Sequence, residues 1–169
     1  RTNLTIPNHA PPRPARTHTT SAIQLGKYPI TETLPTQHRY KVLDAQFHPR
    51  YPEVQHVVSC GMDGTLIWDT SSGDVVVRLP VSATVGEEKH HTAQVECLCW
   101  AYSGSILFTG SKDNTVRAWD AANNYSFCEV LTSHKAPVLC ATYCPETQML
   151  ATSGRDSTVK IWNVSSLNP

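Results

Sequence analysis

Residues 108–120 read FTGSKDNTVRAWD and residues 151–163 read ATSGRDSTVKIWN, so the two stretches match in chemical type at most positions. In each, a short run suited to a β-strand leads into a polar turn, Lys112-Asp113-Asn114 or Arg155-Asp156-Ser157, and a second run ends near a tryptophan. Asp, Asn and Ser favour turns because their side chains hydrogen-bond to the nearby backbone. The pattern therefore predicts two hairpins of the same design, 43 residues apart.

The repeated unit extends to the N-terminal side of each hairpin, and a third copy precedes the other two. In every copy a histidine stands four residues before a valine, and an aromatic residue stands five residues after that valine. The three sets are His38, Val42 and Phe47; His91, Val95 and Trp100; and His134, Val138 and Tyr143. The earliest hairpin is VSCGMDGTLIWD at residues 58–69. A repeat of about 43 residues is typical of repeat proteins, in which each copy forms one supersecondary unit.

With these motifs, the chain resembles the WD-repeat family, whose members fold as β-propellers of four-stranded blades. Trp68-Asp69 and Trp119-Asp120 match the dipeptide that names the family, and Trp162-Asn163 is a variant of it. The resemblance implies an all-β fold, a partial β-propeller of three WD-repeat blades in an incomplete ring. We place the repeats at about 38–80, 91–131 and 134–164, with inner strands near 42–47, 95–100 and 138–143.

The resemblance also implies a buried hydrogen-bonded tetrad of His, Ser or Thr, Asp and Trp in each blade. The corresponding residues are His91, Thr109, Asp113 and Trp119; His134, Thr152, Asp156 and Trp162; and, in the first repeat, His38, Ser59, Asp63 and Trp68. A His-Thr-Asp set also resembles a catalytic triad. Because the set recurs in every repeat, whereas an active site occurs once, we interpret it as structural and expect no enzyme activity.

The first repeat departs from this pattern in the length of its turn. Five positions separate Asp63 from Trp68, where the other repeats have six. Side chains alternate between the two faces of a strand, so one missing residue either moves Trp68 to the wrong face or shortens the turn. The sequence leaves both possibilities open.

Residues 1–37 differ in composition from residues 38–169, which hold the propeller portion. The first segment contains six of the twelve prolines and eight threonines, including the run Ala10-Pro11-Pro12-Arg13-Pro14. Proline lacks the backbone donor that helices and central strands need. We therefore expect residues 1–37 to be a disordered Pro/Thr-rich segment. A short edge strand within residues 22–30 and docking of the PxxP spacing at Pro11 and Pro14 remain alternatives.

Natural propellers close with four to eight blades, so three blades do not complete a ring. We expect the remaining blades to come from a longer parent chain. The alternative is that this chain completes its ring with another chain.

Charge and cysteine usage bear on partners and location. Basic and acidic residues balance at 14 each, which argues against nucleic acid or an anionic membrane as the partner. The six cysteines show no CxxC pair, so we expect no metal site and no cofactor, with Cys97 and Cys140 packing as small buried residues. Reduced thiols and the lack of a signal pattern favour a cytoplasmic or nuclear protein.

The function that the resemblance implies is a protein–protein interaction scaffold or adaptor that presents a propeller face to partner proteins or peptides. The partner-binding positions that it implies precede each turn Asp or follow each blade histidine: Met62, Lys112, Arg155, Tyr40, Gln94 and Lys135. Lys112 and Arg155 either meet an acidic or phosphorylated segment or are solvated loop charges. The alternative function is the recognition part of a larger enzyme, such as a ubiquitin ligase substrate receptor. The Arg that such family members often carry after the WD dipeptide is replaced here by Ser71, Ala122 and Ser165.

Overall fold

A computed structural model describes residues 33–34, 37–82 and 89–167 of the chain. From Leu34 onward the chain forms one compact unit. The regular elements of the described residues are β-strands and two short 3-10 turns. The predicted disorder of residues 1–37, the strand at 22–30 and the PxxP spacing fall almost entirely outside the described residues and stay predictions.

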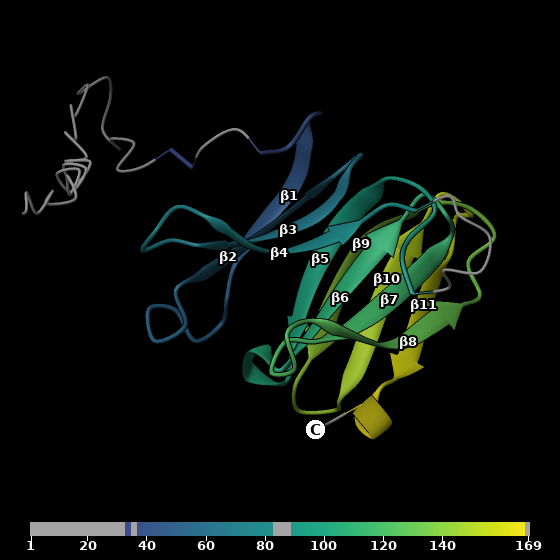
Figure 1. Ribbon diagram of the computed structural model, residues 1–169. Coiled ribbons are helices and arrows are strands. Elements are labelled where there is room, and N and C mark those ends of the chain that lie inside the picture. The colour runs from purple at the N-terminus through teal and green to yellow at the C-terminus, as the bar shows by residue number, and fades with distance from the viewer. Residues whose placement is uncertain (1–32, 35–36, 83–88, 168–169) are drawn as a thin grey trace, which may run out of the picture. The chain divides into compact units, whose positions relative to one another are not determined.

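Eleven strands make three antiparallel sheets in chain order, which are the three predicted blades (Figure 1). The first blade contains β1 (Val42–Phe47), β2 (His56–Gly61), β3 (Gly64–Asp69) and β4 (Val75–Pro80). The second contains β5 (Val95–Ala101), β6 (Ile106–Ser111), β7 (Thr115–Asp120) and β8 (Ser126–Thr132). The third contains β9 (Val138–Cys144), β10 (Met149–Gly154) and β11 (Val159–Asn163). The inner strands lie where the valine spacing predicts them, which confirms the all-β class and the blade pattern.

One turn in each blade contains a residue whose backbone lies in the left-handed region. Asn114 and Ser157 have φ angles of 70° and 61° at the third position of their turns, and Gly64 has a φ of 109° in the first blade. Asn and Gly adopt this region with little steric cost. The turn residues from which the hairpins were predicted therefore also mark where the strands end.

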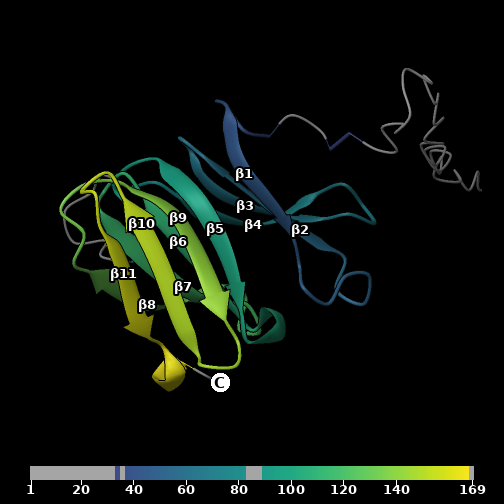
Figure 2. The ribbon, with the colours of Figure 1, turned by 180° about the vertical axis from the view of Figure 1, so that it is seen from behind.

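Neighbouring blades pack through their inner strands, with β5 between β1 and β9 (Figure 2). Side chains of β5 alternate: Leu98 belongs to the core shared with the first blade, whereas Cys97 and Cys99 belong to the core shared with the third. This alternation is the period of two expected of a strand covered on both faces. The second blade is therefore the most buried of the three, with Leu107 and Phe108 both fully enclosed.

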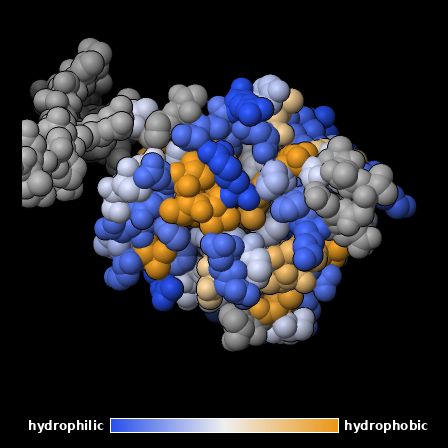
Figure 3. Space-filling model, in the orientation of Figure 1, coloured by the Kyte–Doolittle hydropathy of each residue, from blue (hydrophilic) through white to orange (hydrophobic). Residues whose placement is uncertain are grey.

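The two end blades each keep one open face, so the ring is not closed in the part of the chain that the structure describes. On the third blade, Val159 and Ile161 are 70% and 64% exposed, whereas their counterparts Val116 and Ala118 in the second blade are fully buried. On the first blade, Phe47 is 60% exposed. Figure 3 shows hydrophobic residues gathered in separate patches among hydrophilic ones on one face of the molecule.

The open face also corrects one expectation. Cys97 is buried as predicted, but Cys140 at the same repeat position is exposed. The thiol of Cys97 faces a core that the third blade covers, whereas no described blade covers the face of β9 that carries Cys140. Position within the repeat alone therefore does not fix the burial of a residue in an end blade.

Candidate interaction face

The tetrad of the second blade forms one continuous chain of hydrogen bonds. Trp119 Nε1 donates to Thr109 Oγ1 at 2.9 Å, and Thr109 Oγ1 lies 2.7 Å from His91 Nε2. His91 Nδ1 lies 2.8 Å from a carboxylate oxygen of Asp113. A neutral His91 with its proton on Nδ1 satisfies every member, because the threonine hydroxyl then donates to Nε2 and the imidazole donates to the carboxylate.

The third blade repeats this geometry within 0.2 Å. Trp162 Nε1 donates to Thr152 Oγ1 at 2.8 Å, Thr152 Oγ1 lies 2.9 Å from His134 Nε2, and His134 Nδ1 lies 2.8 Å from Asp156. In both blades the carboxylate also accepts a backbone N–H from the residue after the histidine, Thr92 or Lys135, at 3.0 Å. Each aspartate therefore fastens the turn before β7 or β11 to the segment that precedes the inner strand.

The structure also brings together the four residues of the first blade. Trp68 Nε1 donates to Ser59 Oγ at 2.7 Å, and His38 lies 2.8 Å from Ser59 Oγ and 2.7 Å from Asp63. Of the two possibilities left open by the sequence, the turn is shorter and Trp68 keeps its face. Gly61 pairs directly with Gly64, so Met62 and Asp63 alone make the turn.

The shorter turn of the first blade lacks one hydrogen bond that the other two blades make to the turn aspartate. In the second blade the hydroxyl of Thr115 donates to Asp113 at 2.6 Å, and Thr158 does the same for Asp156 at 2.7 Å. The first blade has Gly64 in place of this threonine, counted back from the tryptophan, and the next residue, Thr65, is buried with its hydroxyl unpaired among the described residues. Asp63 therefore holds its turn with fewer bonds than the other two aspartates.

The electrostatics of the second blade favour a charged Asp113 and a neutral His91. Burial opposes ionisation of Asp113, but His91, Thr115 and the Thr92 N–H outweigh it and hold the pKa of the Asp113 carboxyl well below its usual range. Hydrogen bonds from Thr158 and the Lys135 N–H lower the pKa of Asp156 in the same direction. Burial lowers the pKa of His91, and the neighbouring Asp113 only partly offsets this effect.

The same geometry argues against a nucleophilic role for the threonines. Thr109 and Thr152 are buried, and each hydroxyl oxygen already accepts a hydrogen bond from a tryptophan. A serine or threonine nucleophile has to reach a substrate carbonyl, which these side chains do not. The repeated sets are therefore structural in their geometry, and the absence of enzyme activity stays a prediction.

The predicted partner-binding residues lie on and beside the turns that the tetrads fasten. Five of the six sit at exposed positions, and Gln94 is half-buried; the six are Tyr40, Met62, Gln94, Lys112, Lys135 and Arg155. The backbone of these segments is fixed by cross-links: Lys112 N–H donates to Gln94 O, and Arg155 N–H donates to Pro137 O, both at 2.9 Å. Together these six residues form the turn face.

Neighbouring turns of the second and third blades lie close together. The Asn114 amide lies 3.3 Å from the Ala136 carbonyl oxygen, with its nitrogen oriented as the donor. Asn114 follows Lys112 by two residues, and Ala136 is the residue after Lys135. The basic side chains of Lys112 and Lys135 therefore project from adjoining segments of one surface.

The ammonium group of Lys112 already has partners within the protein. This group lies 3.3 Å from Glu96 Oε1 and 3.2 Å from Gln94 Oε1, and Gln94 in turn donates to Glu96. Among the described residues, by contrast, Lys135 and Arg155 form no ion pair. The sequence reasoning missed Glu96, although its place one residue after Val95 on the inner strand puts it beside the turn.

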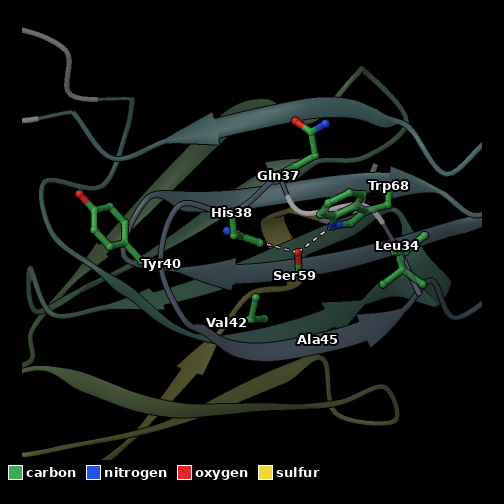
Figure 4. Close-up of a pocket in the computed structure, with 9 residues that line it drawn as sticks. Leu34, Gln37, His38, Tyr40, Val42, Ala45, Ser59 and Trp68 are labelled. Carbon is green, nitrogen blue, oxygen red and sulfur yellow. Dashed lines mark hydrogen bonds between the residues drawn. The ribbon is translucent and has the colours of Figure 1, made fainter. Parts of the chain in front are cut away.

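A groove lies beside the turn face on the open side of the first blade (Figure 4). Its volume is about 330 Å³, and Tyr40 and Leu34 stand at its two ends. The His38–Ser59–Trp68 chain lines its floor, together with the side chains of β1 and β2: Val42, Ala45 and Val57. The groove is mostly apolar, as expected for a sheet face that neighbouring blades cover elsewhere in the molecule.

Two polar contacts between the first and second blades were not predicted from the sequence. Asp44 accepts the Leu98 N–H at 2.9 Å, and Gln46 donates to the Leu98 carbonyl oxygen at 2.8 Å. Both side chains reach across from β1 to the free edge of β5 and satisfy its backbone, which otherwise exposes unpaired groups. The other repeats have cysteine or threonine at these positions, so no repeat pattern signals the contact.

Comparison with known proteins defines the class of the chain. The family model described as WD domain, G-beta repeat matches residues 83–120 and 125–163. Residues 83–88 lie outside the described residues, and the rest of both matches falls on the second and third blades. The second and third blades therefore belong to the WD-repeat family.

Two curated relatives align with part of the chain. The "Probable cytosolic iron-sulfur protein assembly protein Ciao1" of Culex quinquefasciatus is 31% identical over 108 residues, which cover 63% of this chain and 29% of the relative. The "WD-40 repeat-containing protein MSI4" of Arabidopsis thaliana is 36% identical over 85 residues, covering 49% of this chain and 15% of the relative. The chain thus spans less than a third of the length of either relative.

Two solved structures show the same fold. "Structure of U3-55K" superposes with a TM-score of 0.68 at 22% identity, over 76% of this chain and 38% of that one. "Crystal structure of RRP9 WD40 repeats" gives a TM-score of 0.66 at 21% identity, over 76% and 37% of the two chains. At these identities the likeness concerns the propeller fold.

The described residues hold neither a metal-binding cluster nor a membrane-spanning helix. Within them, no three His, Cys, Asp or Glu side chains come together in a way that could hold a metal ion. Nor do these residues contain a helix long and apolar enough to cross a membrane.

Proposed function

We propose that the chain is an adaptor or scaffold that binds partner proteins or peptides through the turn face. The WD-repeat propeller fold is that of a protein–protein interaction scaffold in general, and the adaptor role is the more specific step proposed here. The observation that supports it most is the fastening of each turn by a hydrogen-bonded tetrad. A recognition surface needs side chains that are exposed while their backbone is already ordered, because ordering on binding costs affinity.

The charge of the turn face suggests the kind of segment that it binds. Lys135 and Arg155 are exposed, and no acidic side chain among the described residues pairs with them. Charge-assisted hydrogen bonds from Arg and Lys to carboxylate or phosphate groups are stronger than neutral ones. We therefore favour an acidic or phosphorylated peptide, with Lys112 available if it exchanges Glu96 for the ligand.

The surroundings of the face allow an apolar contribution as well. Tyr40 is 56% exposed and stands at one end of the groove of the first blade, and Met62, which is 46% exposed, lines a neighbouring hollow together with Tyr40. Exposed aromatic side chains and Met are enriched at protein interfaces. A partner that combines an acidic stretch with an apolar side chain would use both parts of this surface.

We further propose a cytoplasmic or nuclear location. The six cysteines are free thiols, three of them exposed, which suits a reducing compartment. One relative is named as a cytosolic protein, and this name supports the proposal for the present chain by similarity.

Binding to an immobilised array of acidic 12-residue peptides, each with and without phosphoserine, tests the proposal. We expect binding to a subset, with a Kd that rises about tenfold in the double variant Lys135→Ala and Arg155→Ala, which removes two charge-assisted contacts. Arg50→Ala is the matched control, since Arg50 is exposed on the loop after β1, at the opposite end of its sheet. Absence of binding to every peptide, or an equal loss in the control, would overturn the proposal.

A further inference from the structure

His48 joins the first blade to the second through a contact that no other repeat contains. It follows β1, at the end of the sheet opposite the turn face, and its counterparts in the other repeats are Ala101 and Cys144. The imidazole is 4% exposed, and its ring meets the Trp100 ring of β5 edge-on, with 4.7 Å between the centroids. His48 Nε2 lies 3.1 Å from the carbonyl oxygen of Gly104, 56 residues away in sequence.

The hydrogen bonds around His48 fix its tautomer. The backbone N–H of Arg50 donates to His48 Nδ1 at 3.2 Å, so Nδ1 has to carry a lone pair. The proton of the neutral ring is then on Nε2, where it donates to the Gly104 carbonyl oxygen. Both nitrogens are satisfied only while the ring is neutral.

A second proton has no acceptor in this site. It would sit on Nδ1 and point at the Arg50 N–H, which is a donor facing a donor. The groups that bear electrostatically on His48 are Arg50 and His56, both of which oppose a positive charge. The groups that pack on it from the second blade, Gly104 and Trp100, are uncharged, and no carboxylate among the described residues pairs with it.

The His48 ring is packed closely against Gly104 and has no room to move toward it. A methyl group added at Gly104 would lie 2.4 Å from the His48 ring, so the imidazole fills the space beside that residue. Nearby, His56 approaches the buried Tyr125 hydroxyl of the second blade at 3.3 Å and pairs across the sheet with Asp69. His56 takes no part in the bond to Gly104, whereas His48 contacts the Gly104 carbonyl oxygen and the Arg50 N–H directly.

We propose that His48 is an acid-sensitive latch, which holds the first blade against the second while neutral and loosens their junction when protonated. Burial lowers the pKa of His48, and the bond to Gly104 only partly offsets it, in agreement with a neutral latch at physiological pH. When the junction opens, His48 regains its ordinary pKa near 6.5, so acid favours the open form. The device would couple the exposure of the first blade to the pH of the compartment.

Hydrogen exchange followed by mass spectrometry tests the latch in the full chain. After correction for intrinsic rates, we expect protection of β1 and β2 to fall up to about tenfold relative to β9 and β10 between about pH 7.5 and about pH 5.5. His48→Gln keeps an N–H donor for Gly104 and gains no proton, so its relative loss should stay below about twofold. His56→Gln is the matched control and should keep the wild-type loss.

Three results would overturn the latch. They are equal acid loss in the first and third blades of the wild type, an undiminished loss in His48→Gln, and abolition of the loss in His56→Gln. If His48→Gln does not fold, long-range ¹H–¹⁵N correlation of the wild-type ring decides the matter. A neutral ring with its proton on Nε2 at neutral pH is expected, and a charged ring or a proton on Nδ1 would contradict the latch.

Discussion

The indole nitrogen of Trp68 donates to the hydroxyl of Ser59 at 2.7 Å, in the blade whose turn is one residue short. The same donor–acceptor pair, Trp to Thr, occurs at 2.9 and 2.8 Å in the other two blades. The pairing of the tryptophan-bearing strand with the strand before it is therefore the same in β2–β3 as in β6–β7, and only the turn between them is shorter. A sheet face that is buried tolerates a shorter turn but not a slipped register.

Replacement of Ser59 by alanine should destabilise the fold by about 1–3 kcal/mol, because it leaves the Trp68 N–H and a His38 nitrogen without their partner in a largely buried place. Urea unfolding followed by tryptophan fluorescence measures the change. Ser133→Ala is the matched control, since Ser133 is exposed, and its effect should stay within about 0.5 kcal/mol. Equal midpoints for the two variants would show that the Ser59 hydroxyl has no structural part.

Gly104 is needed for space as well as for its backbone angle. Its φ is 99°, and an added methyl group would lie 2.4 Å from the His48 ring. We expect Gly104→Ala to cost more than the about 1–3 kcal/mol typical of a strained backbone alone. Gly73→Ala provides the comparison, because Gly73 has a φ of 74° and no such clash is found there. If both variants lose the same stability, the blade junction at His48 is looser than the structure indicates.

Stability should fall as the pH drops below about 6.5, the ordinary pKa of histidine. The pKa of His91 is lowered in the folded state, so the unfolded chain binds more protons in this range and the free energy of unfolding rises with pH. The lowered pKa values of Asp113 and Asp156 add a further loss once the pH falls through the usual range of aspartate. Urea midpoints between about pH 8 and about pH 5 measure the first effect. A midpoint that is constant or rises on acidification would contradict it.

The Lys112–Glu96 pair should contribute little to stability, since the lysine side chain is 39% exposed. A double-mutant cycle with Lys112→Ala and Glu96→Gln should give a coupling of about 0.2–1 kcal/mol. Screening by salt should reduce it further. A coupling well above this range would mean that the pair is a fixed part of the fold and that Lys112 is not available to a ligand.

The features that could be predicted from sequence are those that the repeat encodes locally. Histidine, turn aspartate and tryptophan recur at fixed spacing, so strands and tetrads follow from three copies of one pattern. The missing residue in the first repeat is visible in the sequence. Periodicity alone does not decide whether it moves Trp68 to the other face of its strand or shortens the turn. Register is decided by burial of the sheet face, which is a property of the packed blade.

The features that sequence reasoning missed are long-range and occur once. Asp44 and Gln46 bind Leu98 more than 50 residues away, and His48 binds Gly104 at a similar separation. None of the three has a counterpart in the other repeats, so comparing the copies does not point to them. The exposure of Cys140 was missed for a related reason, because it depends on whether a further blade covers the face.

Indole resonances provide the most direct test that each of the three repeats forms a blade with its own tetrad. Three of the four tryptophans, Trp68, Trp119 and Trp162, should show slowly exchanging Nε1–H signals in a ¹H–¹⁵N spectrum. Each signal should shift when its own partner is replaced, in Ser59→Ala, Thr109→Ala or Thr152→Ala. Three such matched responses are the predicted result. A Trp68 signal that exchanges freely and ignores Ser59→Ala would contradict the tetrad of the first blade, and with it the common design of the turn face.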